Sequence, residues 1–95
     1  MHIRSMRILW DPEKAKLNFR KHKVRFSDAE FVLFDPMALT REDEGTYDEQ
    51  RFVSIGRDAT DRIVVVVYTY RGEDIRLISA RRATPKERKS YEEGI

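Results

Sequence analysis

The feature that most constrains the fold is the segment from Ile63 to Tyr70, which is apolar on both faces of a strand. Its β-branched and aromatic residues favour a strand, and the lack of a polar face indicates a central strand that is covered on two sides. The sequence Arg71-Gly72-Glu73-Asp74 then predicts a turn into a second strand over 75–80, which makes an antiparallel hairpin. The core is therefore expected to lie around a sheet.

The rest of the chain supplies the other elements of an α+β domain. Alternation, caps and breakers predict, in chain order, a strand over 6–10, a helix over 12–22, a short helix over 27–34, an edge strand over 37–40, strands over 51–56, 63–70 and 75–80, and a helix over 85–93. The order β-α-α-β-β-β-β-α predicts two layers, an antiparallel sheet with the helices packed on one side of it.

Capping signals mark the three helix starts. Asp11 precedes Pro12, and both Ser27-Asp-Ala-Glu30 and Thr84-Pro85-Lys86-Glu87 have the spacing of a capping box. Aromatic residues at or beside the periodic apolar positions are assigned to the core: Trp10, Phe19, Phe26, Phe31, Phe34 and Phe52.

Length and cysteine content exclude several classes of protein. A chain of 95 residues can build one small core, and the lack of cysteine excludes a disulfide framework and thiolate chemistry. The longest apolar run, 63–67, is too short to span a bilayer, and the N-terminus lacks the apolar core of a signal peptide. We therefore expect a cytoplasmic protein without a membrane partner.

Charge is segregated along the chain although the net charge is only +2. Residues 1–25 carry eight Lys or Arg against two acids, and residues 69–91 carry seven against three, whereas residues 42–49 carry five acids and no base. Two basic segments around an acidic loop indicate one surface for a polyanion and another for a different partner.

The segment 69–91 holds the residue types that RNA cleavage without a metal requires: a base, an acid and cations for the phosphorane. Strict alternation would put Leu77 and Arg81 on one face of the strand and Arg76 and Arg82 on the other. We favour Arg81 and Arg71 as catalytic cations. Arg76, Arg82, Lys86 and Lys89 are candidates for RNA binding, although structural pairing explains Arg76 and Arg82 equally well.

Three further residues could transfer protons, each with a structural alternative. His22 has a side chain whose ordinary pKa suits a base and an acid near neutrality, but a histidine at a helix end more often interacts with the helix dipole. Glu73 could act as a base beside Arg71, or could be a solvated turn residue. Tyr91 lies one helical turn after Glu87 and could stack on a base, donate a proton or pack on the sheet.

The acidic loop does not predict a metal site. Its carboxylates, Glu42, Asp43, Glu44, Asp48 and Glu49, lack a spacing that would hold them in fixed geometry, so a solvated loop or a contact for a basic partner is the better interpretation. No metal or other cofactor is expected.

An ordered set of motifs resembles the BrnT toxins: Trp10-Asp11-Pro12, Asn18-Phe19-Arg20-Lys21-His22, Val24-Arg25-Phe26, Asp35-Pro36, the run 51–57, the run 75–84, Glu87-Arg88 and Tyr91. The resemblance implies a type II toxin–antitoxin ribonuclease with a RelE-like fold. It also implies a BrnA-type antitoxin, through which alone the toxin would contact operator DNA.

Two positions depart from the family pattern. Lys23 stands where the family usually has glycine, so we expect a less sharply turned helix end. Residues 1–5 precede the usual start and are interpreted as an N-terminal extension or a cloning remnant, which leaves 6–95 as one toxin domain.

The leading hypothesis is an endoribonuclease toxin that cuts RNA without a metal and so inhibits translation and growth. A nucleic-acid-binding module that grips phosphates without cutting is the first alternative. A degenerate toxin that serves only as the antitoxin-binding half of a repressor complex is the second.

Overall fold

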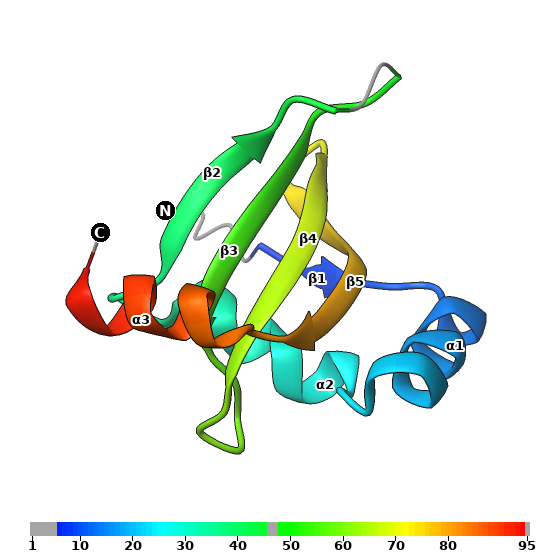
Figure 1. The fold of residues 1–95 in the computed structure, drawn as a ribbon. Coiled ribbons are helices and arrows are strands. Elements are labelled where there is room, and N and C mark those ends of the chain that lie inside the picture. Colours follow the sequence, from blue (N-terminus) through cyan, green and yellow to red (C-terminus); the bar gives the residue numbers. More distant parts are fainter. Residues whose placement is uncertain (1–5, 46–47, 95) are drawn as a thin grey trace, which may run out of the picture.

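The computed structural model describes residues 6–45 and 48–94, so the N-terminal extension expected at 1–5 lies outside the described residues. Its elements, shown in Figure 1, are β1 (Ile8–Leu9), α1 (Pro12–His22), α2 (Phe26–Ala29), the 3-10 helix η1 (Glu30–Phe34), β2 (Leu39–Asp43), β3 (Arg51–Arg57), β4 (Ile63–Arg71), β5 (Asp74–Arg82) and α3 (Pro85–Glu93). In the described part of the chain, no helix is long and apolar enough to cross a membrane.

The five strands form one mixed sheet in the order β1-β5-β4-β3-β2. The last four strands follow one another through turns and loops, so each pairs antiparallel with the next. The expected antiparallel sheet is wrong at its far edge, where β1 pairs in parallel with β5. The helices α1, α2 and η1 separate β1 from the other strands, so no tight turn forces an antiparallel pairing there.

Helices cover both faces of the sheet, which corrects the expectation that they pack on one side. Val64 and Val66 of the central strand face α2 and η1, where Phe26 and Val32 complete the core. On the opposite face α3 lies near Val53 of β3. Figure 1 shows α3 in front of β3. We call these the core face and the α3 face.

Two of the three capping predictions are confirmed. Asp11 accepts a hydrogen bond from the Glu13 amide, and Thr84 and Glu87 form a complete capping box. The box at Ser27 is wrong, because the helix begins at Phe26 with Arg25 as an N-cap that makes no side-chain hydrogen bond. The earlier start places the Phe26 ring in the core.

The predicted aromatic core is confirmed in part. Phe26 is buried, and Trp10 and Phe52 pack against the core. Phe31 and Phe34 are instead 49% and 68% exposed, and Phe19 is 37% exposed. In a 3-10 helix residues three apart eclipse one another, so Phe31 and Phe34 share an outward edge of η1 while Val32 fills the core.

A bulge at Ile78 overturns the strict alternation expected along β5. Leu77 pairs with Tyr68 whereas Ser79 pairs with Val67, so Ile78 is left without an opposite residue. Leu77 and Ala80 consequently both face the core, and Arg81 lies on the α3 face rather than on the face of Leu77.

Asn18 of α1 continues the hydrogen bonding at the β5 edge, where the short β1 ends. Its Oδ1 accepts from the Ala80 amide at 3.0 Å, and its Nδ2 donates to the carbonyls of Ala80 at 2.9 Å and Val24 at 3.1 Å. The side chain therefore pairs with the Ala80 backbone as a residue of a neighbouring strand would, and it fixes α1 against the sheet.

Candidate functional site: an arginine-lined groove

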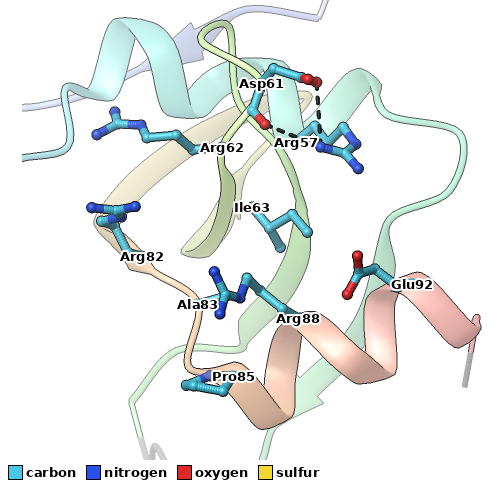
Figure 2. Close-up of a pocket in the computed structure, with 9 residues that line it drawn as sticks. All are labelled: Arg57, Asp61, Arg62, Ile63, Arg82, Ala83, Pro85, Arg88 and Glu92. Carbon is cyan, nitrogen blue, oxygen red and sulfur yellow. Dashed lines mark hydrogen bonds and ion pairs between the residues drawn. The ribbon is translucent and has the colours of Figure 1, made fainter.

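A groove of about 680 Å³ lies at one end of the sheet, where the β3–β4 turn faces the start of α3. Figure 2 shows Arg62 and Arg82 on one side, Arg57 and Glu92 on the other, and Arg88 between them. The lining residues are Arg57, Asp61, Arg62, Ile63, Arg82, Ala83, Pro85, Arg88 and Glu92. We call this cavity the arginine groove.

Two of its four arginines are fixed by carboxylates and two are not. Arg57 pairs with Asp61 at 3.4 Å, and Arg62 pairs with Asp58 at 3.0 Å. Arg82 and Arg88 have no ion-pair partner among the residues that the structure describes. The groove therefore offers two guanidinium groups to an anionic ligand without first breaking an internal pair.

Asp58 organises the turn that carries Arg62. Its fully buried carboxylate accepts hydrogen bonds from the amides of Thr60 and Arg62, both at 2.9 Å, and from the Thr60 hydroxyl at 2.8 Å. These bonds close an Asx-type turn, so the backbone at Arg62 is held in place.

Arg81 and Glu87 fix the start of α3 on the sheet. The two Nη atoms of Arg81 each donate to a Glu87 carboxylate oxygen at 2.8 Å, and the Thr84 amide donates to the same carboxylate at 2.8 Å. The bonds from Arg81 and then from Thr84 lower the pKa of Glu87 to about 2, although burial opposes the change. This pair determines where Arg82 and Arg88 stand.

Asp35 connects α3 to β3 on the Arg57 side of the groove. It accepts from the Tyr91 hydroxyl at 2.6 Å and from the Arg57 amide at 2.9 Å. Burial raises the pKa of Asp35, but these bonds and one from the Met37 amide outweigh burial and leave the pKa below its ordinary value. Burial, and then the bond to Asp35, raise the pKa of Tyr91.

Among the residues predicted from the sequence, only some meet at the groove. Arg82 lines it. Arg81 and Tyr91 do not line it but hold α3 in place through their bonds to Glu87 and Asp35. Lys86 and Lys89 are exposed on α3 but do not line the groove, and Lys89 approaches Glu93 at 4.0 Å.

The other predicted residues lie elsewhere. Arg71 ends β4 and contacts Glu49 at 3.6 Å, whereas Arg81 pairs with Val65 near the opposite end of that strand, about 20 Å away. Arg71 and Arg81 therefore cannot hold one phosphate, and Glu73 stays with Arg71 at the hairpin turn. His22 and Arg76 are also outside the groove: His22 lies in a shallow hollow beside Ser79, and Arg76 pairs with Thr69.

Sequence reasoning missed every charged residue of the groove except Arg82. Arg57 and Arg62 flank the predicted turn at 58–61, and Arg88 and Glu92 lie four residues apart on one face of α3. A signal existed, because arginines on either side of a tight turn come close together. Whether this turn then lies next to α3 depends on the tertiary fold.

The described residues contain no group of three or more histidine or acidic side chains placed to hold a metal ion. Of the acidic segment, Glu42 and Asp43 belong to β2, and the Asp43 carboxylate accepts from the Gly45 amide at 3.2 Å. Glu49 pairs with Arg51 at 3.3 Å. These carboxylates are spread along a strand and a loop.

Comparisons with known proteins agree with one another. Residues 10–87 match the family model described as the ribonuclease toxin BrnT of type II toxin–antitoxin systems. The chain is also similar to the crystal structure of the Brucella abortus ribonuclease toxin BrnT, with 30% identity, a TM-score of 0.66, and coverage of 84% of this chain and 99% of that one. A comparison with curated proteins gives no match.

Proposed function

The chain belongs to the BrnT family of ribonuclease toxins of type II toxin–antitoxin systems, and from this premise we propose that it cuts RNA in the arginine groove. The observation that carries the proposal is the pair of guanidinium groups of Arg82 and Arg88, which have no ion-pair partner in the described part of the chain and line a groove that also holds two acids. Arginine is well suited to bind a phosphodiester, because its planar group donates two parallel hydrogen bonds.

The proposed reaction needs no metal. The ribose 2′-hydroxyl attacks the adjacent phosphorus, and the 5′-oxygen leaves with a proton from water at the mouth of the groove. Arg82 and Arg88 stabilise the charge of the phosphorane, which develops in the transition state. Glu92 takes the 2′-hydroxyl proton, since it lines the groove and His22 and Glu73 do not.

Arg81 and Tyr91 act in this scheme through other residues. Both Nη atoms of Arg81 donate hydrogen bonds to Glu87, and the Tyr91 hydroxyl donates one to Asp35. We therefore assign them to positioning α3. Cleavage of cytoplasmic RNA would inhibit translation and growth, as in a RelE-like toxin.

A type II toxin has an antitoxin partner, and we propose a BrnA-type protein that also carries the operator-binding function. The rings of Phe31 and Phe34 contact each other edge to face and are exposed, and Met37, three residues further along the chain, is 66% exposed; we call these three residues the apolar patch. Asp35 lies between Phe34 and Met37 in sequence and accepts from the amide of Arg57, which lines the groove, so this segment of the chain is held next to a groove residue. Exposed apolar side chains of this kind supply the anchors of protein interfaces. An antitoxin seated there would cover the groove.

The test is RNA cleavage by purified protein in excess EDTA. We expect the wild type to cut, Arg82→Ala and Arg88→Ala each to lose about 10²–10³-fold in rate, and both to keep the wild-type melting temperature. Lys89→Ala is the matched control, since it removes an exposed cation from the same helix outside the groove.

Two outcomes would contradict the proposal. Loss of cleavage in EDTA that magnesium or manganese restores would mean that a metal takes part. RNA binding without cleavage by any preparation would support the non-catalytic module instead.

A further inference from the structure

A second basic hollow lies on the surface of α1. It has a volume of about 540 Å³, and its lining includes three aromatic residues and four cations: Trp10, Phe19, Phe26, Lys16, Arg20, Lys23 and Arg25. We call it the Phe19 hollow. Aromatic rings among cations are the combination with which proteins bind single-stranded nucleic acid, because bases stack on the rings while cations meet the phosphates.

The cations are gathered around the Phe19 ring. The Arg25 guanidinium carbon lies 5.0 Å from the ring centroid, and the Lys23 Nζ lies 5.7 Å from it. Lys16 pairs with Glu13 at 3.7 Å, but Arg20, Lys23 and Arg25 have no acidic partner in the described part of the chain. The hollow therefore has an excess of positive charge.

The backbone conformation of Lys23 is unfavourable for a residue that has a side chain. It caps α1 in the left-handed region with φ of +61°, where glycine is the least strained residue. A lysine here costs stability, yet its amino group is directed to the ring of Phe19. Backbone strain of this kind is found most often at functional sites.

The hollow adjoins the arginine groove through one residue. Arg62 lines the groove, and its Nη1 donates to the Lys23 carbonyl at 3.3 Å. The Arg62 side of the groove is therefore the side on which the Phe19 hollow begins, and an extended ligand could pass from one to the other over Arg62.

We propose that the Phe19 hollow is a second RNA subsite, which holds single-stranded RNA that extends beyond the cleaved phosphodiester. A base packs against Phe19, and the backbone phosphates meet Arg20, Lys23 and Arg25. This inference rests on the proposed function, since it extends the path of the same RNA. An acidic antitoxin segment is the competing occupant. Two observations favour RNA: the Arg62 bond to the Lys23 carbonyl joins the hollow to the groove, and Phe19 is 37% exposed.

The test compares a 4-mer with a 12-mer of single-stranded RNA, both 2′-O-methylated so that they cannot be cut, by fluorescence anisotropy from 50 to 200 mM salt. The short RNA reports on the groove, and the gain in affinity with length reports on the hollow. Two variants remove the features in question. Lys23→Gly deletes the cation and relieves the backbone strain, and Phe19→Leu keeps the packing but removes the ring.

We expect Lys23→Gly to melt at a higher temperature than the wild type and yet to bind the 12-mer about fivefold more weakly. Its salt slope should fall by about 0.7, the value for one lost phosphate contact on a single strand. Phe19→Leu should lose a similar factor with an unchanged slope. Both should bind the 4-mer as the wild type does. Lys21→Ala is the control, because it removes a cation of α1 that does not line the hollow.

Wild-type affinity of both variants for the 12-mer would overturn the subsite, and so would a loss confined to antitoxin binding. Failure of the proposed function has a different signature. In that case Arg82→Ala and Arg88→Ala would leave binding of the 4-mer unchanged.

Discussion

Single carboxylates outside the groove determine where its arginines stand. Glu87 accepts two hydrogen bonds from Arg81, and Asp35 accepts one from the Tyr91 hydroxyl and one from the Arg57 amide. Each carboxylate joins α3 or its start to a different part of the sheet. The guanidinium groups that face the ligand can then remain unpaired, because the helix that carries Arg88 is held by other contacts.

Glu87 should make stability depend on pH in the acid range. Its pKa in the folded protein is about 2, below the ordinary value of 4.5, so its contribution is complete above about pH 4.5 and is lost as the pH falls toward 2. We expect Glu87→Gln to lower the free energy of unfolding by about 1–2 kcal/mol at pH 7, after allowance for partial exposure of the pair. Urea denaturation should show this difference vanish near pH 2. A difference that is constant with pH would contradict the pairing.

Tyr91 should be needed for stability more than for chemistry. Tyr91→Phe removes a hydrogen bond to an ionised acceptor, which should cost about 1–2 kcal/mol in the free energy of unfolding. Cleavage well below the melting temperature should stay within about threefold of wild type, since the ring still packs. Thermal melting and single-turnover cleavage measure the two effects. A 100-fold loss in the folded variant would make Tyr91 a catalytic residue.

At the scale of elements, the β5 edge combines a strand with a helix side chain. The two-residue β1 leaves the rest of the edge open, and Asn18 covers it with two hydrogen bonds to the Ala80 backbone and makes a third to the Val24 carbonyl. The adjacent bulge at Ile78 lets Ala80 face the core while Arg81 turns to α3. These two features connect the helices of the core face with the helix of the groove.

Asn18→Ala should be strongly destabilising. It leaves the buried amide and carbonyl of Ala80 without partners, which should cost about 2–4 kcal/mol in the free energy of unfolding. Leu17→Ala, at a neighbouring position that is 59% exposed, should change stability by under about 0.5 kcal/mol. Urea denaturation of both variants decides the matter. Equal stability of the two would mean that water satisfies the Ala80 backbone.

At the scale of the whole molecule, charged and apolar surfaces have separate places. The groove and the Phe19 hollow are basic, and we propose that RNA binds along them, while η1 exposes the apolar side chains of Phe31 and Phe34. This arrangement would let an antitoxin anchor on apolar contacts and block RNA without matching every arginine.

Phe34→Glu should separate inhibition from catalysis. A charge in the apolar patch should weaken antitoxin binding at least about tenfold, because it would be buried without a partner in the complex. RNA cleavage by the free protein should be unchanged. Calorimetric titration with the purified antitoxin and a cleavage assay test both statements, with Lys86→Glu on exposed α3 as the control for added negative charge. Full inhibition of Phe34→Glu would place the antitoxin interface elsewhere.

The sequence by itself determined the elements that depend on local interactions. The central strand, the caps at Asp11 and Thr84, and the α+β class all follow from residues close together in the chain. Family membership followed in the same way, because short ordered motifs carry it. Of the groove, local patterns located Arg82 and placed its supports Arg81 and Tyr91 in the same segment.

Tertiary structure alone decided the rest. The parallel pairing of β1, the bulge at Ile78 and the outward turn of η1 each follow from packing between segments that are distant in sequence. The bulge moved Arg81 to the α3 face, and the length of the hairpin separated it from Arg71. The groove joins a turn after residue 57 to a helix that starts at residue 85. Spacing along the chain carries no information about such a meeting, because long-range packing of the sheet creates it.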